Sequence, residues 1–172
     1  SLFGGLLEHW GMAKTESWLR SVQANLARPP RGGDIDQIRG VGTGECSIAV
    51  SNTYYIARLM RSKLPEDQAL MARVSVSFPD QRGAGTHVNI AGGAVARHAP
   101  HRAEAIRFLE YLASPSAQTY FAEGNNEWPV ANDAKLANQA LESWGRFKSD
   151  PVPASTIGMN QTRVQQMLDR TG

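Results

Sequence analysis

The segment CSIAVSNTYYIARLM, residues 46–60, decides the fold that we expect for this chain. Its run Ser47–Val50 is short and apolar, which is typical of a buried strand. A helix is predicted from about Thr53, because four apolar side chains then share one face: Tyr55, Ile56, Leu59 and Met60. In an open α/β sheet, the junction between a strand and the next helix lies at the edge where ligands bind.

The flanking sequence extends this pattern in both directions. Residues 24–27 and 72–78 are further strand candidates, and the second of them alternates polar and apolar side chains. Asp34 is expected to cap a helix that ends near Gly42–Gly44, and Pro65 to stop the helix that follows Thr53. The order strand, helix, strand, helix, strand predicts a parallel α/β layout.

The pattern changes after Pro79. Residues 87–96 are a glycine-interrupted strand candidate, and residues 102–113 are predicted to form an amphipathic helix. Ser114 is expected to cap a further helix, with Pro115 at its first position. Helices are also predicted at the two ends of the chain, in residues 1–20, 133–147 and 160–170, with Pro151–Pro153 as a linker.

Composition excludes several classes of protein. The 172 residues are 41% hydrophobic and 20% charged, which suits one ordinary domain or two unequal lobes. A net charge of +2 is too small to indicate nucleic acid or an anionic membrane as a partner. The sequence contains no apolar run of about 18 residues, so no membrane-spanning helix is predicted. Cys46 is the only cysteine, so an internal disulfide is excluded, and we expect it to be a small core residue.

The adjacent tyrosines Tyr54 and Tyr55 have two interpretations. In the first, Tyr55 belongs to the core and Tyr54 is a half-exposed lid. In the second, both are ligands of a metal ion. A phenol ionises at neutral pH only beside a strongly positive group, and a trivalent cation is such a group. Phenolate oxygen suits ferric iron by the rule that hard ligands bind hard ions. Residue chemistry alone leaves both interpretations open.

Other candidate sites are weaker. His9 is expected to be a partly buried histidine with a satisfied side chain, and His87 to make a local hydrogen bond. His98 and His101 are expected to lie in a solvated turn. The glycines at 40–44 and 83–85 lack the lysine and the following helix of a phosphate loop. No Gly-x-Ser-x-Gly motif and no matched carboxylate pair support an enzyme.

Several strings of this sequence resemble one known family. They are ANLARPPRGGDIDQI, GTGECSIAVSNTYYIARL, the strand GTHVNI, the helix pair FLEYLASPSAQ and the crossing segment NEWPV. Their order and spacing are similar to those of the periplasmic ferric-iron-binding proteins, which are transferrin-like solute receptors of bacterial ABC importers. The resemblance covers nearly all of the chain.

The resemblance implies a metal site. Tyr54 and Tyr55 match the family's adjacent tyrosinate ligands of Fe(III). Asn52 matches a position near the synergistic anion, carbonate or phosphate, to which its amide can donate. Arg28, Arg31 and Asp34 line the neighbouring loop and receive no assignment.

The resemblance also implies a two-lobed α/β fold like that of type II periplasmic binding proteins. Residues 1–78 would form a unit of the second lobe, 79–128 would return to the first lobe, and 129–172 would pack back on the second. Family members are roughly twice as long, so we expect a fragment without the amino-terminal half and its remaining iron ligands. The start at Ser1, without an initiator Met, agrees with a cut end.

The function that follows is capture of Fe(III) in the periplasm and delivery to an ABC permease, without catalysis. The first alternative is a receptor of the same scaffold for a non-metal ligand, such as an organic anion or a polyamine. The second alternative is an enzyme at the sheet edge. We expect no nucleic-acid partner, and an exposed apolar face in 79–128 to favour self-association of the fragment.

Overall fold

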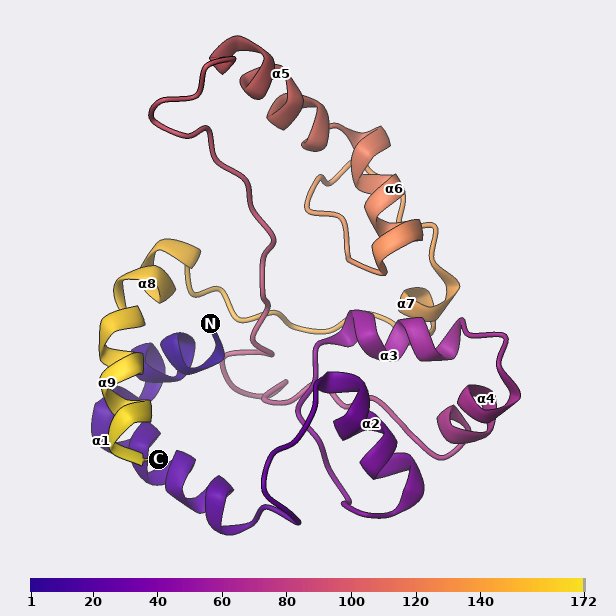
Figure 1. The fold of residues 1–172 in the computed structure, drawn as a ribbon, viewed down its shortest axis with the longest axis vertical. Helices are drawn as coiled ribbons and strands as arrows, with labels where there is room; N and C mark the ends of the chain where they lie inside the picture. Colours follow the sequence, from indigo (N-terminus) through magenta and orange to yellow (C-terminus); the bar gives the residue numbers. More distant parts are fainter. Residues whose placement is uncertain (172) are drawn as a thin grey trace. The chain divides into compact units, whose positions relative to one another are not determined.

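The computed structural model describes residues 1–171, and this part of the chain is helical (Figure 1). Its helices are α1 (Leu2–Ala24), α2 (Asp34–Thr43), α3 (Thr53–Met60), α4 (Pro65–Met71), α5 (Arg102–Leu112), α6 (Pro115–Asn125), α7 (Gln139–Ser143), α8 (Ala154–Met159) and α9 (Gln161–Thr171). The β-structure found in residues 1–171 is one isolated parallel bridge between Thr86 and Ser149.

The parallel sheet of the predicted α/β layout is not formed within residues 1–171. The segments 24–27, 47–50, 72–78 and 87–96 were all expected to be strands, and none is paired into a sheet within residues 1–171. A strand is stable only when its N–H and C=O groups bond to a neighbouring strand. Without such neighbours, Ile48 and Val50 are 84% and 73% exposed, where a buried strand was predicted.

The predicted helices are mostly confirmed. Helix α1 contains a non-helical residue, Gly11, at the point where its apolar pattern is interrupted. Helix α2 ends at Gly44, whose φ of 83° lies in the left-handed region that glycine tolerates. The Ser114 hydroxyl accepts a hydrogen bond from the Ala117 N–H and caps α6 as expected.

Two helices, α4 and α8, were missed. Pro65 was expected to stop a helix, but it occupies the first position of α4, where its fixed φ is favourable and its absent N–H costs nothing. The chain turns between Arg61, which ends α3, and Pro65.

The chain divides into two compact units. The first, called the α1 unit here, comprises Ser1–Pro30, Ser77–Ala91 and the described chain from Arg146 onward. In it α1 packs against α8 and α9 (Figure 1). Its core consists of Leu7, Leu19, Val164 and Met167, with Phe3, Met12, Trp18 and Leu168 around them.

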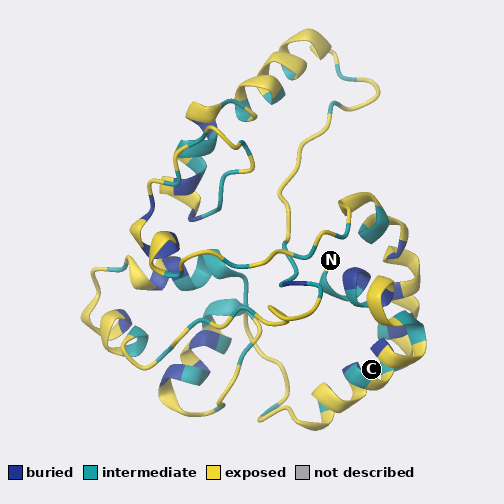
Figure 2. Cartoon of the chain, turned by 180° about the vertical axis from the view of Figure 1, so that it is seen from behind, coloured by how far each residue is buried: buried dark blue, intermediate teal, exposed yellow. Residues whose placement is uncertain are grey.

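The second, called the α3 unit, comprises Arg31–Val76 and Gly92–Gly145. Helices α2, α3 and α4 pack on one another, and α3 also contacts α7. Its core is formed by Ala57, Ala140 and Leu141, with Trp128, Leu136 and Trp144 against them. Within α5, all of which is described, no residue is buried, and Figure 2 shows this helix mostly exposed.

Candidate functional site

Helix α3 positions the tyrosine pair. Its N-cap is Asn52, whose extended backbone (φ −72°, ψ 137°) leads into the first turn at Thr53. The buried residues Ala57 and Leu59 anchor the helix, and Ala57 packs on the Leu141 cluster. Tyr54 and Tyr55 therefore lie in the first turn, where both are half-buried.

The two phenol rings converge. Neighbouring residues on a helix point about 100° apart, so proximity of their rings is not dictated by the helix itself. In this structure the ring centroids of Tyr54 and Tyr55 lie 4.3 Å apart, with the ring planes inclined by 42°. Two phenol oxygens are thus presented by one short stretch of backbone.

The electrostatic surroundings of the pair are negative. The hydrogen bond with the Tyr55 side chain, burial, and the charges of Tyr55, Asp34 and Glu127 raise the pKa of Tyr54 to about 12. A raised pKa means that the neutral phenol is favoured, so a strongly positive ligand is needed to hold the phenolate. The Tyr54 phenol is accordingly protonated at neutral pH when no metal is bound.

Asn52 is engaged by a carboxylate. Its Nδ2 donates to Oδ2 of Asp34 over 3.2 Å, while its side chain makes no cap hydrogen bond to α3 among the described residues. Asp34 is the first residue of α2, and its neighbour Asp36 accepts instead from the Gly33 N–H at 2.8 Å. An asparagine at an N-cap normally bonds its own helix, so the pairing with Asp34 is a distinctive feature of this site.

Sequence reasoning left two of these acidic residues without a role. Asp34 was placed in the neighbouring loop and not assigned, and Glu127 was not singled out. The sequence feature that could have pointed to Glu127 is its neighbour Trp128. Trp128 packs against the core cluster that contains Ala57 of α3, and this places Glu127 near that helix. Arg58, one turn further along α3, lies 5.6 Å from the ring centroid of Tyr55 and supplies a nearby positive charge.

Arg28 and Arg31 remain without a role. The Arg28 guanidinium bonds the Pro29 carbonyl at 3.5 Å, and the Arg31 carbonyl accepts from the Gln37 side chain at 2.6 Å.

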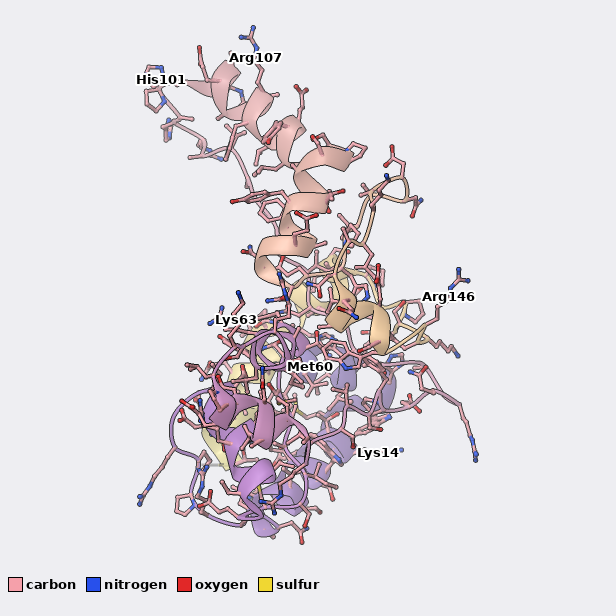
Figure 3. All side chains as sticks on the ribbon, turned by 90° about the vertical axis from the view of Figure 1, so that its right-hand side faces the viewer. Lys14, Met60, Lys63, His101, Arg107 and Arg146 are labelled. Carbon is pink, nitrogen blue, oxygen red and sulfur yellow. The ribbon has the colours of Figure 1, made fainter. Side chains whose placement is uncertain are left out.

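The His9 side chain has a partner, as expected, whereas the partner of His87 is distant in sequence and not local. His9 pairs with Asp150 at 2.9 Å, and His87 bonds the Ser1 hydroxyl at 3.0 Å. His98 and His101 are exposed, and Figure 3 shows the His101 side chain at the outer end of α5.

Cys46 is half-buried and not a core residue, because the segment after it is not covered by neighbouring strands. Residues 1–171 contain no group of three or more His, Cys, Asp or Glu side chains that would hold a metal. Over the same residues, no helix has the length and apolarity needed to cross a membrane.

Comparison with known proteins identifies the class. Residues 11–150 match the family model described as bacterial extracellular solute-binding protein, so the chain belongs to that family. This is a family of solute-binding proteins and not a family of enzymes.

Individual relatives show which members of this family the chain resembles. The chain is 42% identical over 164 residues to iron uptake protein A2 of Synechocystis, covering 94% of this chain and 47% of that protein. It is 24% identical over 162 residues to the major ferric iron-binding protein of Neisseria meningitidis, covering 94% and 46%. The chain thus spans about half the length of the curated relatives it matches.

Solved structures agree. A Trichodesmium protein described as a complex with iron and citrate ligands superposes with a TM-score of 0.93 at 46% identity, covering 99% of this chain and 54% of that one. The ferric binding protein from Campylobacter jejuni gives 0.94 at 36% identity, with the same coverages. The resemblance to ferric-iron-binding proteins drawn from the sequence is confirmed, and the backbone follows part of their fold although its strand segments are unpaired here.

Proposed function

We propose that this chain is part of the substrate-binding component of a bacterial ABC importer that captures Fe(III) in the periplasm. The observation that carries the proposal is the convergence of the Tyr54 and Tyr55 rings, 4.3 Å apart, at the start of α3. The similarity to iron uptake protein A2 supports the choice of iron over other solutes.

Tyr54 and Tyr55 are the metal ligands of this proposal. Phenolate oxygens are hard donors, and Fe(III) is the kind of hard, highly charged cation that replaces the protons of two phenols. The charges of Asp34 and Glu127, which raise the pKa of Tyr54, also favour a cation at the same place.

Asn52 is the anion-binding residue of the proposal. A synergistic anion, carbonate or phosphate, fills metal positions that two phenolates leave open and accepts from the Asn52 amide. The remaining ligands come from the half of the relatives' length that this chain does not span.

The proposed lobe organisation follows the family resemblance. Residues 1–78 belong to the second lobe, 79–128 return to the first, and 129–172 pack back on the second. Closing of the lobes around iron completes the site, and the closed form delivers it to the ABC permease.

The exposed apolar side chains of α5 provide a surface for self-association. Phe108 and Tyr111 are 59% and 57% exposed, and an apolar face of this kind favours pairing with a second copy. Size-exclusion chromatography at two concentrations tests this, and a monomer at both would contradict it.

The decisive experiment is a ferric citrate titration of the chain, followed by the visible charge-transfer band of iron-bound tyrosinate. Tyr54→Phe and Tyr55→Phe are expected to weaken the band. The matched control is Tyr111→Phe, because Tyr111 is an exposed tyrosine on α5 and its loss should leave the band unchanged.

A second experiment allows for weak iron binding by a chain that carries only some of the proposed ligands. The chain is joined behind the preceding half of iron uptake protein A2, and the same titration is repeated. A band in the joined protein that needs both tyrosines supports the proposal. Absence of the band in both proteins contradicts the proposal. It favours the alternative, a receptor for a non-metal solute such as an organic anion or polyamine.

A further inference from the structure

The Asn52 amide already faces a carboxylate in the metal-free chain, so an external anion on its second N–H would lie close to a negative charge. Its Nδ2 donates to Oδ2 of Asp34 at 3.2 Å in the metal-free chain. A carbonate or phosphate bound to the same amide must displace Asp34 or lie against it, and like charges at such distances repel. Asp34 therefore disfavours any external anion beside this amide.

The Asp34 carboxylate is held in a fixed position beside Asn52. It is the first residue of α2, a helix anchored by the buried Ile38 and in contact with α3. The carboxylate is thus held beside Asn52 by packing of two helices and not by a loop. Asp36, in the same helix turn, is occupied by the Gly33 N–H and does not reach Asn52 in place of Asp34.

We propose that Asp34 is a specificity-determining residue that keeps small anions off Asn52 until the metal is bound. The inference rests on the proposed function, because it concerns the anion position of that site. Fe(III) held by two phenolates still adds net positive charge beside Asp34 and Asn52 after two protons are released, which reduces the repulsion between Asp34 and the incoming anion. The order of loading is metal first and anion second.

The test measures anion binding without any metal. Inorganic phosphate is titrated into the metal-free chain and its Asp34→Asn variant by calorimetry at low ionic strength. The unaltered chain is expected to bind phosphate at least about tenfold more weakly than the variant, since one repulsive charge is removed. Asp36→Asn is the matched control, with the same charge change on the same helix turn, and should behave as the unaltered chain.

Two further variants assign the effect to the pair. Adding Asn52→Ala to Asp34→Asn removes the donor and should abolish the gained phosphate binding. Exchanging the two side chains, Asp34→Asn with Asn52→Asp, restores the carboxylate–amide pair and should again exclude phosphate. Far-UV circular dichroism and thermal unfolding verify that each variant folds.

The outcomes separate this inference from the proposed function. Equal phosphate affinity in the unaltered chain and Asp34→Asn overturns the inference, as does an equal gain in Asp36→Asn. The iron titration does not enter this comparison. If the iron band appears but Asp34→Asn does not change phosphate affinity, the proposed function is supported and the inference is contradicted. If the iron band is absent, the proposed function itself is contradicted.

Discussion

The Nδ2 atom of Asn138 lies 3.0 Å from Oδ1 of Asn126, and the Arg61 guanidinium donates to the same Oδ1 at 2.6 Å. Arg61 ends α3, Asn126 follows α6 and Asn138 caps α7. This partly buried network therefore joins the far end of the tyrosine-bearing helix to two other helices of the α3 unit. Its integrity fixes how α3 is held.

Removing Asn138 should destabilise the chain. Asn138→Ala deletes the donor to Asn126 and to the Ala122 carbonyl, and the cap of α7, all of them buried. We expect a loss of about 2–3 kcal/mol in the free energy of unfolding, measured with urea. Asn125→Ala, at an exposed position of α6, is the control and should change stability little.

Gly42 permits the close approach of α2 and α4. A Cβ added there would clash with Cδ1 of Leu70. Gly42→Ala is expected to lower the free energy of unfolding by about 1–3 kcal/mol through overpacking. Gly124→Ala in α6 meets nothing within 4 Å, and should stabilise by up to about 1 kcal/mol. Opposite signs for the two variants in urea unfolding are the expected result, and equal effects would contradict it.

The phenol titration of Tyr54 should be displaced upward. Its pKa is about 12 because of the hydrogen bond with Tyr55, burial and nearby negative charge. A raised pKa stabilises the fold below the ordinary phenol value near 10, and this contribution is lost as pH rises above it. Ultraviolet titration should show a late-titrating tyrosine that moves toward the ordinary value in Tyr55→Phe. An unchanged late step in that variant would contradict the assignment.

Iron release should be steep in acid. If both tyrosines bind as phenolates, two protons are released per ion, and at pH well below both phenol pKa values the affinity falls about 100-fold per pH unit. Tyr55→Phe should reduce this to about tenfold per unit. Competition against a chelator of known proton dependence measures both slopes, and equal slopes would exclude Tyr55 as an ionised ligand.

His87 should make the α1 unit sensitive to acid. Burial and the chain's amino terminus lower the pKa of His87, while Asp150 acts in the opposite direction. A lowered histidine pKa gives stability that is present above the ordinary value near 6.5 and is lost as pH falls. Proton NMR should show His87 titrating below that value, and lower still in Asp150→Asn. A His87 pKa that rises in this variant would be inconsistent with the geometry.

The sequence by itself determined most of the helices and the family. Ser114 and Pro115 mark the start of α6, and Gly44 marks the end of α2, because capping and turn signals are local.

Only the tertiary structure decided which distant residues meet. Asp34 reaches Asn52, and Glu127 acts on Tyr54, through packing of helices that no local pattern encodes. The failed strand predictions have the same physical reason: an apolar run such as Ser47–Val50 becomes a strand only when another chain segment supplies its hydrogen-bond partners.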